Sequence, residues 1–178
     1  MNPLTESLRL CAVIFQWIIL NWPNTAIGFA MRRKYMANRC ACLGRSFRML
    51  SGCSISGYHL IRVGDNSSFA QDVVIAIGPG NNELNIGDDS FIGPGCYFRN
   101  MNHRFDRLDV HIMDQGHEGS DIIIGNGVWI GARCLLLPGT VIGDHCVIAA
   151  GSVVSTAIPS YSIAAGNPAR VIKKRVAQ

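Results

Sequence analysis

Residues 124–153 read IGNGVW-IGARCL-LLPGTV-IGDHCV-IAAGSV, five successive hexapeptides that each begin with an aliphatic residue. The same frame extends back to residue 63, so twelve hexapeptides can be aligned in all. Their first positions share one property, since all twelve are apolar. They are Val63, Phe69, Ile75, Ile86, Ile92, Phe98, Ile124, Ile130, Leu136, Ile142, Ile148 and Val154. A strict short period of this kind indicates a repeat architecture.

The period of six specifies a shape. Six residues supply one short strand and one turn, so three hexapeptides make one triangular coil. Successive coils then pair through main-chain hydrogen bonds at a spacing of about 4.8 Å, with the first-position side chain pointing inward. Glycine or another small residue at the second position eases the turn. The sequence therefore predicts a mainly β fold, a parallel β-helix of triangular section. Its handedness does not follow from the spacing.

The same frame explains most of the cysteines. Cys96, Cys134 and Cys146 fall on fifth positions, and Cys53 does so in a less regular coil that begins at Leu43. We expect them to be small buried hydrophobic side chains, not nucleophiles. The seven cysteines include no C-x-x-C pair, which argues against a secreted disulfide framework and a zinc ribbon. Reduced thiols favour a cytoplasmic location.

The repeat also divides the chain. We expect a helical hairpin over residues 1–42, the β-helix over 43–159 and a basic tail over 160–178. The frame breaks at a five-residue insertion, 81–85, and at a twenty-residue loop, 104–123. A long polar loop inside a compact repeat is usually functional.

Charge is segregated along the chain. Residues 1–62 carry a net +7, residues 63–169 a net −7 and residues 170–178 a net +4. A basic head beside an apolar segment suits an anionic membrane surface, and a short basic tail suits a phosphate-bearing ligand. Solvated surface charge is the alternative for either cluster. The acidic body argues against nucleic acid as a partner.

The most irregular hexapeptide is FRNMNH, which directly precedes the long loop. It has Arg99 where glycine is usual, Asn102 where a small residue is usual, and ends in His103. Departures from a local rule tend to mark functional sites, and histidine at a corner suits a general base. A surface histidine bonded to its own loop is the alternative. With His111 and His117 it lacks the spacing of a zinc site on successive coils, so no metal is expected.

Several strings together resemble a known family. They are NHRF at 102–105, QG at 115–116, the repeat block at 122–154 and IPSYSIAAGNPARVIKKR at 158–175. They resemble the hexapeptide-repeat O-acetyltransferases, which include galactoside and maltose acetyltransferases and polysaccharide-modifying enzymes of bacteria. The resemblance covers about 60–178. It implies a left-handed β-helix, a homotrimer and a groove between subunits for acetyl-CoA.

The resemblance also implies site residues. The catalytic histidine of the family matches His103, and Asn102 beside it is the second catalytic candidate. Six residues are expected along the acetyl-CoA groove: Ala132, Ala150, Ser155, Thr156, Arg170 and Lys173. The alanines would follow the pantetheine, and the two cations would meet the CoA phosphates. The Ser-Thr pair stands where the family has Thr-Lys, so the lysine is missing here.

The implied reaction is direct transfer. Nε2 of His103 would take the proton of a sugar hydroxyl, which attacks the thioester while backbone N–H groups hold the oxyanion. The expected acceptor is a surface-polysaccharide or lipid-linked saccharide precursor. An amino-sugar N-acetyltransferase and a non-catalytic trimeric β-helix scaffold are the alternatives.

The amino-terminal segment is apolar and then basic. Residues 8–22 are apolar nearly all round, and a second, amphipathic stretch covers 25–42. Eleven uninterrupted positions reach only about 16 Å as a helix, too short to span a bilayer. Trp17, Trp22 and the following cations suit an anchor on the inner face of the cytoplasmic membrane. The competing interpretation is a helix that packs on the end of the β-helix.

Overall fold

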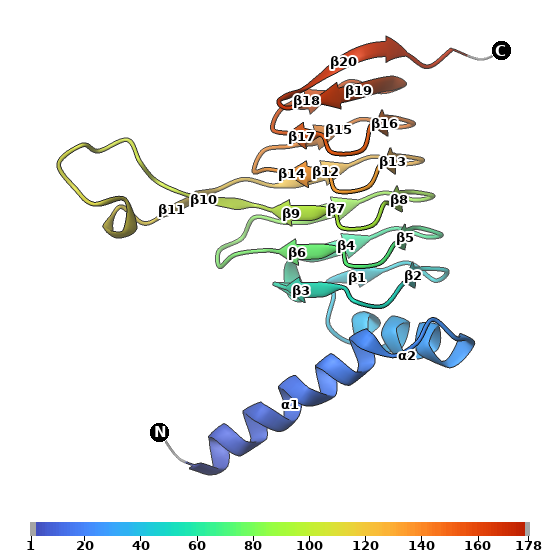
Figure 1. Ribbon diagram of the computed structural model, residues 1–178, viewed down its shortest axis with the longest axis vertical. Coiled ribbons are helices and arrows are strands. Elements are labelled where there is room, and N and C mark those ends of the chain that lie inside the picture. Colours follow the sequence, from blue (N-terminus) through green and yellow to red (C-terminus); the bar gives the residue numbers. More distant parts are fainter. Residues whose placement is uncertain (1–2, 177–178) are drawn as a thin grey trace.

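The twelve apolar first positions form the inside of a triangular column. The structure, a computed structural model, describes residues 3–176. Residues 1–2 of the predicted segment 1–42 and residues 177–178 of the predicted segment 160–178 lie outside the described residues. The column is a left-handed parallel β-helix that stands on two helices and carries one long arm (Figure 1).

Three sheets form the faces of the column, parallel throughout except for the antiparallel last strand of the chain. The first face contains β1 (Cys42–Leu43), β4 (Ile61–Val63), β7 (Leu84–Ile86), β12 (Ile122–Ile124), β15 (Val141–Ile142) and β18 (Ala157–Ile158). The second face contains β2 (Arg48–Met49), β5 (Ser68–Phe69), β8 (Phe91–Ile92), β13 (Trp129–Ile130), β16 (Val147–Ile148), β19 (Ser162–Gly166) and β20 (Ala169–Lys174). The third face contains β3 (Ser54–Ser56), β6 (Val74–Ala76), β9 (Tyr97–Arg99), β14 (Leu135–Leu136) and β17 (Val153–Val154). A short 3-10 helix, Tyr58–Leu60, precedes β4.

The core is a stack of like side chains. All twelve predicted first-position residues are buried, and the parallel register sets each above its equivalent, as Ile130 lies between Ile92 and Ile148. The predicted burial of Cys53, Cys96, Cys134 and Cys146 is also confirmed. The interior is therefore one continuous apolar column.

A ladder of polar side chains holds the corner between the first and second faces. In each coil a side-chain oxygen accepts a hydrogen bond from the backbone N–H of the preceding coil. The bonds run Arg45 N to Asp65 Oδ1 (2.7 Å), Asp65 N to Asp88 Oδ1 (2.7 Å), Asp88 N to Asn126 Oδ1 (2.8 Å), Asn126 N to Asp144 Oδ1 (2.7 Å) and Asp144 N to Ser160 Oγ (3.0 Å). These bonds satisfy turn donors that the sheets leave unpaired.

The arm leaves the column between the third and first faces. Its stem is an antiparallel pair, β10 (Met101–His103) and β11 (His117–Gly119), and a 3-10 turn, Ile112–Asp114, lies near its tip. The loop was expected to begin at residue 104, but the chain already departs after Asn100. The buried amide of Asn100 accepts from Gly78 N and donates to Asn82 O, both at 2.9 Å, and so anchors the stem.

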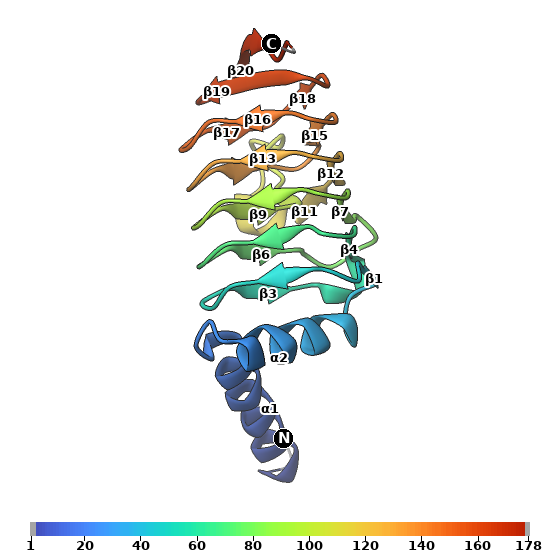
Figure 2. The ribbon, with the colours of Figure 1, turned by 90° about the vertical axis from the view of Figure 1, so that its right-hand side faces the viewer.

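The two amino-terminal helices have different positions. Helix α2 (Ala26–Ala37) lies across the first coil, whereas α1 (Pro3–Asn21) projects away from it (Figure 2). Arg32, which the sequence groups with the surface cations, is in fact fully buried. Its guanidinium donates to Met49 O (2.7 Å), Trp22 O (2.6 Å) and Asn24 Oδ1 (2.8 Å). This clamp and the packing of Tyr35 and Met31 against the core fix α2 on the column, whereas Ile27 is exposed.

The predicted tail is ordered structure. β19 pairs with β16 below it and with β20 in an antiparallel hairpin above it. The hairpin thus covers the last coil. Within residues 3–176, no helix combines the length and the hydropathy that a membrane crossing would require.

Candidate active site

His103 lies at the base of the arm. The antiparallel register sets it opposite His117, and the two imidazole rings are 4.2 Å apart between centroids at 42°. His103 is half-buried against the column, and His117 is exposed. Because neighbouring side chains in a strand point to opposite faces, Asn102 lies on the other face of the stem. Within one chain, the side chains of Asn102 and His103 therefore do not face the same site.

One nitrogen of His103 is unsatisfied. Its Nδ1 is buried and has no hydrogen-bond partner among the described residues. A buried polar atom without a partner costs about 1–3 kcal/mol, so such atoms mark places where another group binds. The tautomer of a catalytic imidazole is set by the partner of its second nitrogen. Among the described residues, none supplies a partner for Nδ1 of His103.

Ala132 and Ala150 stack at the corner between the second and third faces. Gly131 N donates to Ile148 O and Gly151 N donates to Ala132 O, both at 2.8 Å, so the two corners are joined by backbone bonds. A Cβ on Gly131 would lie 2.6 Å from Ala150 N, so only glycine allows this approach. Methyl side chains leave this part of the backbone accessible to an extended ligand.

Two cations lie on the final hairpin, Arg170 near that corner and Lys173 farther back along the second face. Arg170 pairs with Ala165 across the final hairpin, and Lys173 pairs with Ile163. Both side chains are exposed. Neither forms an ion pair with another described residue. Among the described residues, no carboxylate therefore competes with an anionic ligand for these two side chains.

Comparison with known proteins supports the fold. Residues 121–156 match the family described as bacterial transferase hexapeptide (six repeats). A maltose O-acetyltransferase from Clostridium difficile 630 is 27% identical with a TM-score of 0.81, over 99% of this chain and 90% of that one. A galactoside acetyltransferase, solved with coenzyme A, is 27% identical with a TM-score of 0.79, over 98% of this chain and 84% of that one. The chain is similar to the hexapeptide-repeat acetyltransferases.

One curated relative gives a shorter match. A probable acetyltransferase of Mycobacterium tuberculosis is 40% identical over 115 residues, which are 65% of this chain. The match spans 37% of that relative, little more than a third of its length. The match to this relative therefore covers about two thirds of this chain.

The predicted site residues of this acetyltransferase-like chain divide between two corners. His103 leaves from the corner between the third and first faces, and Ser155 and Thr156 lie at the same corner two coils higher. Ala132, Ala150 and Arg170 lie at the other edge of the third face. That edge is about five residues away, or roughly 15 Å at about 3.3 Å per residue. One chain does not bring the histidine to the alanine corner.

Two residues of the site region were not assigned by sequence. A cavity of about 210 Å³ on the third face is lined by Arg99, Met101, His117, Ser56 and the Ile77–Pro79 turn. The sequence marks Arg99 only as a departure from the repeat, and His117 only as one of three histidines that lack the spacing of a zinc site. Their proximity depends on strand pairing across the arm, which no local pattern reveals. Among the described residues, no group of three His, Cys, Asp or Glu side chains could hold a metal.

Proposed function

We propose that this protein is an acetyl-CoA-dependent O-acetyltransferase that acts on a sugar hydroxyl. The observation that carries the proposal is His103, half-buried with an unpartnered Nδ1 at the root of the arm, in a fold shared with maltose and galactoside acetyltransferases. The small corner of Ala132 and Ala150 and the unpaired cations Arg170 and Lys173 suit pantetheine and phosphate groups respectively.

The proposed chemistry needs one base. Nε2 of neutral His103 accepts the proton of the acceptor hydroxyl as its oxygen attacks the thioester carbonyl carbon. The carbon–sulfur bond breaks, CoA leaves as its thiolate, and the imidazolium returns the proton to the sulfur. Backbone N–H groups at a coil turn hold the oxyanion. Ser155 and Thr156 supply hydroxyl groups where a nucleotide would lie.

The site is completed by a second copy of the chain. His103 and the alanine corner lie on opposite edges of the third face, so one subunit supplies the base and its neighbour the pantetheine corner. A closed ring of such contacts gives a homotrimer for a triangular column. The outward aromatic residues Phe91 and Trp129, paired on the second face and 42% and 54% exposed, suit burial by a neighbour.

The acceptor we propose is a saccharide precursor of a surface polysaccharide, free or lipid-linked. An amino-sugar N-acetyltransferase would use the same base, and matched sugar and amino-sugar acceptors separate the two. A non-catalytic trimeric scaffold would bind no acetyl-CoA. The unpaired Nδ1 of His103 favours catalysis over the scaffold.

Replacement of the base tests the proposal. We expect His103→Ala to lower kcat by about 10²- to 10⁴-fold, because a general base contributes that much, while acetyl-CoA still binds by calorimetry. His59→Ala, an exposed histidine on the first coil, is the matched control and keeps full activity. A fully active His103→Ala protein would end the assignment, and an absence of acetyl-CoA binding by the wild type would favour the scaffold.

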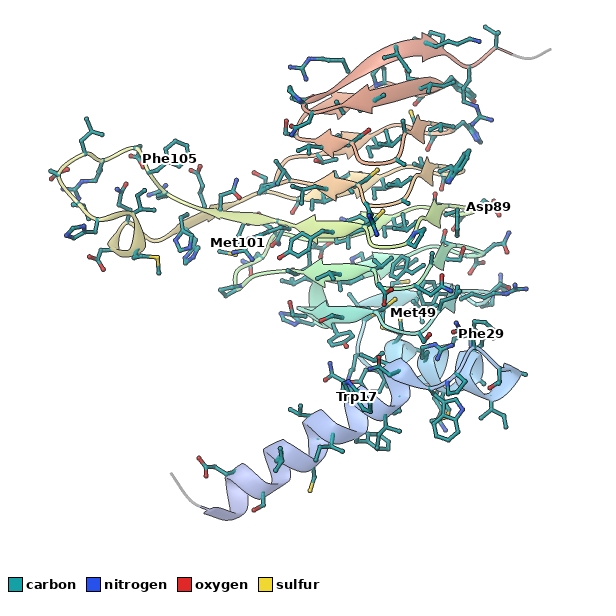
Figure 3. The ribbon with its side chains drawn as sticks, in the orientation of Figure 1. Trp17, Phe29, Met49, Asp89, Met101 and Phe105 are labelled. Atoms are coloured by element: carbon teal, nitrogen blue, oxygen red, sulfur yellow. The ribbon has the colours of Figure 1, made fainter. Side chains whose placement is uncertain are left out.

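We also propose that α1 lies on the inner face of the cytoplasmic membrane. Six of its apolar side chains are 40–65% exposed: Leu10, Val13, Ile14, Phe15, Trp17 and Ile18. Figure 3 shows Trp17 on the projecting helix. The exposed cations Lys34 and Arg39 flank a groove of about 300 Å³ between the helices. An exposed apolar helix next to cations suits an anionic lipid surface.

Vesicle sedimentation tests the membrane proposal. The protein should bind vesicles of phosphatidylcholine with phosphatidylserine better than phosphatidylcholine alone, and less well in high salt. A Phe15→Ser/Trp17→Ser variant should bind more than tenfold more weakly, since each large apolar side chain contributes up to about 1.5–3 kcal/mol. Leu108→Ser/Met113→Ser, an exposed apolar pair on the arm, is the control. Equal binding by both variants would refute the proposal.

A further inference from the structure

Arg99 is an arginine without a partner inside a cavity. It lies at the end of β9, where it points outward and is half-buried. Its side chain makes no hydrogen bond or ion pair with any described residue, whereas Arg104 and Arg107, also in the acidic body, are paired with Glu118 and Asp109. A guanidinium that is partly removed from water and unpaired is a ready anion site.

The surroundings of Arg99 favour an anion further. The register sets Ser56 and Ala76 beside it on the third face, so the outward column next to it consists of small side chains. No Asp or Glu is among the residues that line the cavity. The remaining walls are the turn Ile77–Pro79 and Met101, which lies at the base of the arm (Figure 3). The cavity therefore offers one charge, one hydroxyl and otherwise apolar contact.

The cavity is next to the proposed base. His117 lines it and also contacts the ring of His103, with 4.2 Å between centroids. His117 thus connects the cavity to the proposed base. The volume of about 210 Å³ is below the roughly 300–1,000 Å³ of sites for whole drug-sized ligands. It suits a single acidic substituent or ring, not an oligosaccharide.

From these contacts we infer that the acceptor is an acidic sugar, with its anionic group on Arg99 and its reactive hydroxyl at His103. The inference rests on the proposed function and adds the class of acceptor. The anion can be a carboxylate, as in a uronic acid, or a phosphate ester, because a guanidinium binds both in the same bidentate way. Both groups would be close to the acetylated hydroxyl.

Matched acceptors test the inference. Acetyl transfer by the full chain is measured with glucuronate against glucose, galacturonate against galactose, and glucose 6-phosphate as the phosphate arm. We expect a higher kcat/KM for the acidic member of each pair. Arg99→Gln should lower kcat/KM for acidic acceptors by about 10- to 100-fold, as expected for loss of a charged hydrogen bond, and change that for neutral sugars little. Arg48→Gln removes an exposed outward arginine from the second face and is the matched control.

A binding measurement keeps the test independent of catalysis. Calorimetric titration with glucuronate and with glucose 6-phosphate should show saturable binding that Arg99→Gln weakens and Arg48→Gln does not. Equal use of acidic and neutral sugars, or an unchanged preference in Arg99→Gln, would overturn the inference and leave the acetyltransferase proposal intact. A change of sedimentation in Arg99→Gln would overturn it too, since Arg99 would then serve an interface. Failure of the proposed function is different, because acetyl-CoA binding and transfer to every acceptor would then be absent.

Discussion

Cys53 illustrates how the column changes a titratable side chain. It occupies a fifth position, and its thiol is buried close to the carbonyl oxygens of Ala70 and Leu50, at 3.3 and 3.4 Å. Burial raises the pKa of this thiol from 9.0 to about 11. Burial likewise raises the pKa of Cys40 to about 12, with a further contribution from Cys42. Neither thiol is ionised near neutral pH, so neither is a nucleophile there.

The raised pKa of Cys53 predicts a loss of stability at high pH. Below pH 9 the thiol is neutral in both the folded and the unfolded chain. Above pH 9 the unfolded chain releases the proton first, so the free energy of unfolding falls, by up to about 1.4 kcal/mol per pH unit, until the folded pKa is reached. The advantage of the wild type over Cys53→Ala should therefore shrink by about 1–2 kcal/mol between pH 8 and 10.5 in urea unfolding. Cys11→Ala, at an exposed thiol, is the control. A difference that does not change with pH would contradict the argument.

At the scale of single elements, two substitutions at Asp88 test the side-chain hydrogen bonds that join successive coils at the corner between the first and second faces. Asp88 Oδ1 accepts the N–H of Asp65. Asp88→Ala removes the acceptor, and we expect a loss of about 0.5–1.5 kcal/mol, the net value of one such bond. Asp88→Asn keeps an oxygen at the same place and should cost less. Thermal and urea unfolding measure both, and equal losses would show that the charge matters instead of the bond.

The elements that follow from a period could be predicted, and those that depend on single polar contacts could not. The hexapeptide frame located the coils because burial of Ile92 or Ile130 is dictated by spacing alone. The start of the arm at Met101 depends on the amide of Asn100 reaching Gly78 and Asn82, a contact between coils. The seating of α2 depends on a buried Arg32, whereas composition favours an arginine at the surface.

At the scale of the whole molecule, the division of the site between two corners predicts complementation. His103→Ala lacks the proposed base, and Ala150→Trp would fill the proposed pantetheine corner. Each variant alone should be nearly inactive. Trimers assembled from equal amounts of both should recover about a quarter of wild-type activity, since about a quarter of the contacts join an intact base to an intact corner.

The control for that experiment is a pair of differently tagged His103→Ala chains, which must stay inactive when mixed. Sedimentation must show that the mixed subunits assemble. If the mixed trimers are no more active than either variant alone, one chain holds a complete site.

The arrangement of the candidate residues at two corners also explains which features of the site could be predicted from the sequence. The frame assigns each candidate to a corner, so the placement of Ala132 above or below its neighbours follows from counting. It cannot show that His117 packs on His103 across thirteen intervening residues, because that pairing belongs to the folded arm. It also cannot show what faces each corner in a neighbouring subunit.

The two covered ends have a consequence for how the molecule grows. A column of identical coils has no intrinsic length, and a bare strand edge at either end would be a template for another column. Helix α2, held by Arg32 at one end, and the β19–β20 hairpin at the other make addition along the axis unfavourable. Only the flanks remain for association. These two end structures thus convert a potential filament into a particle of fixed size.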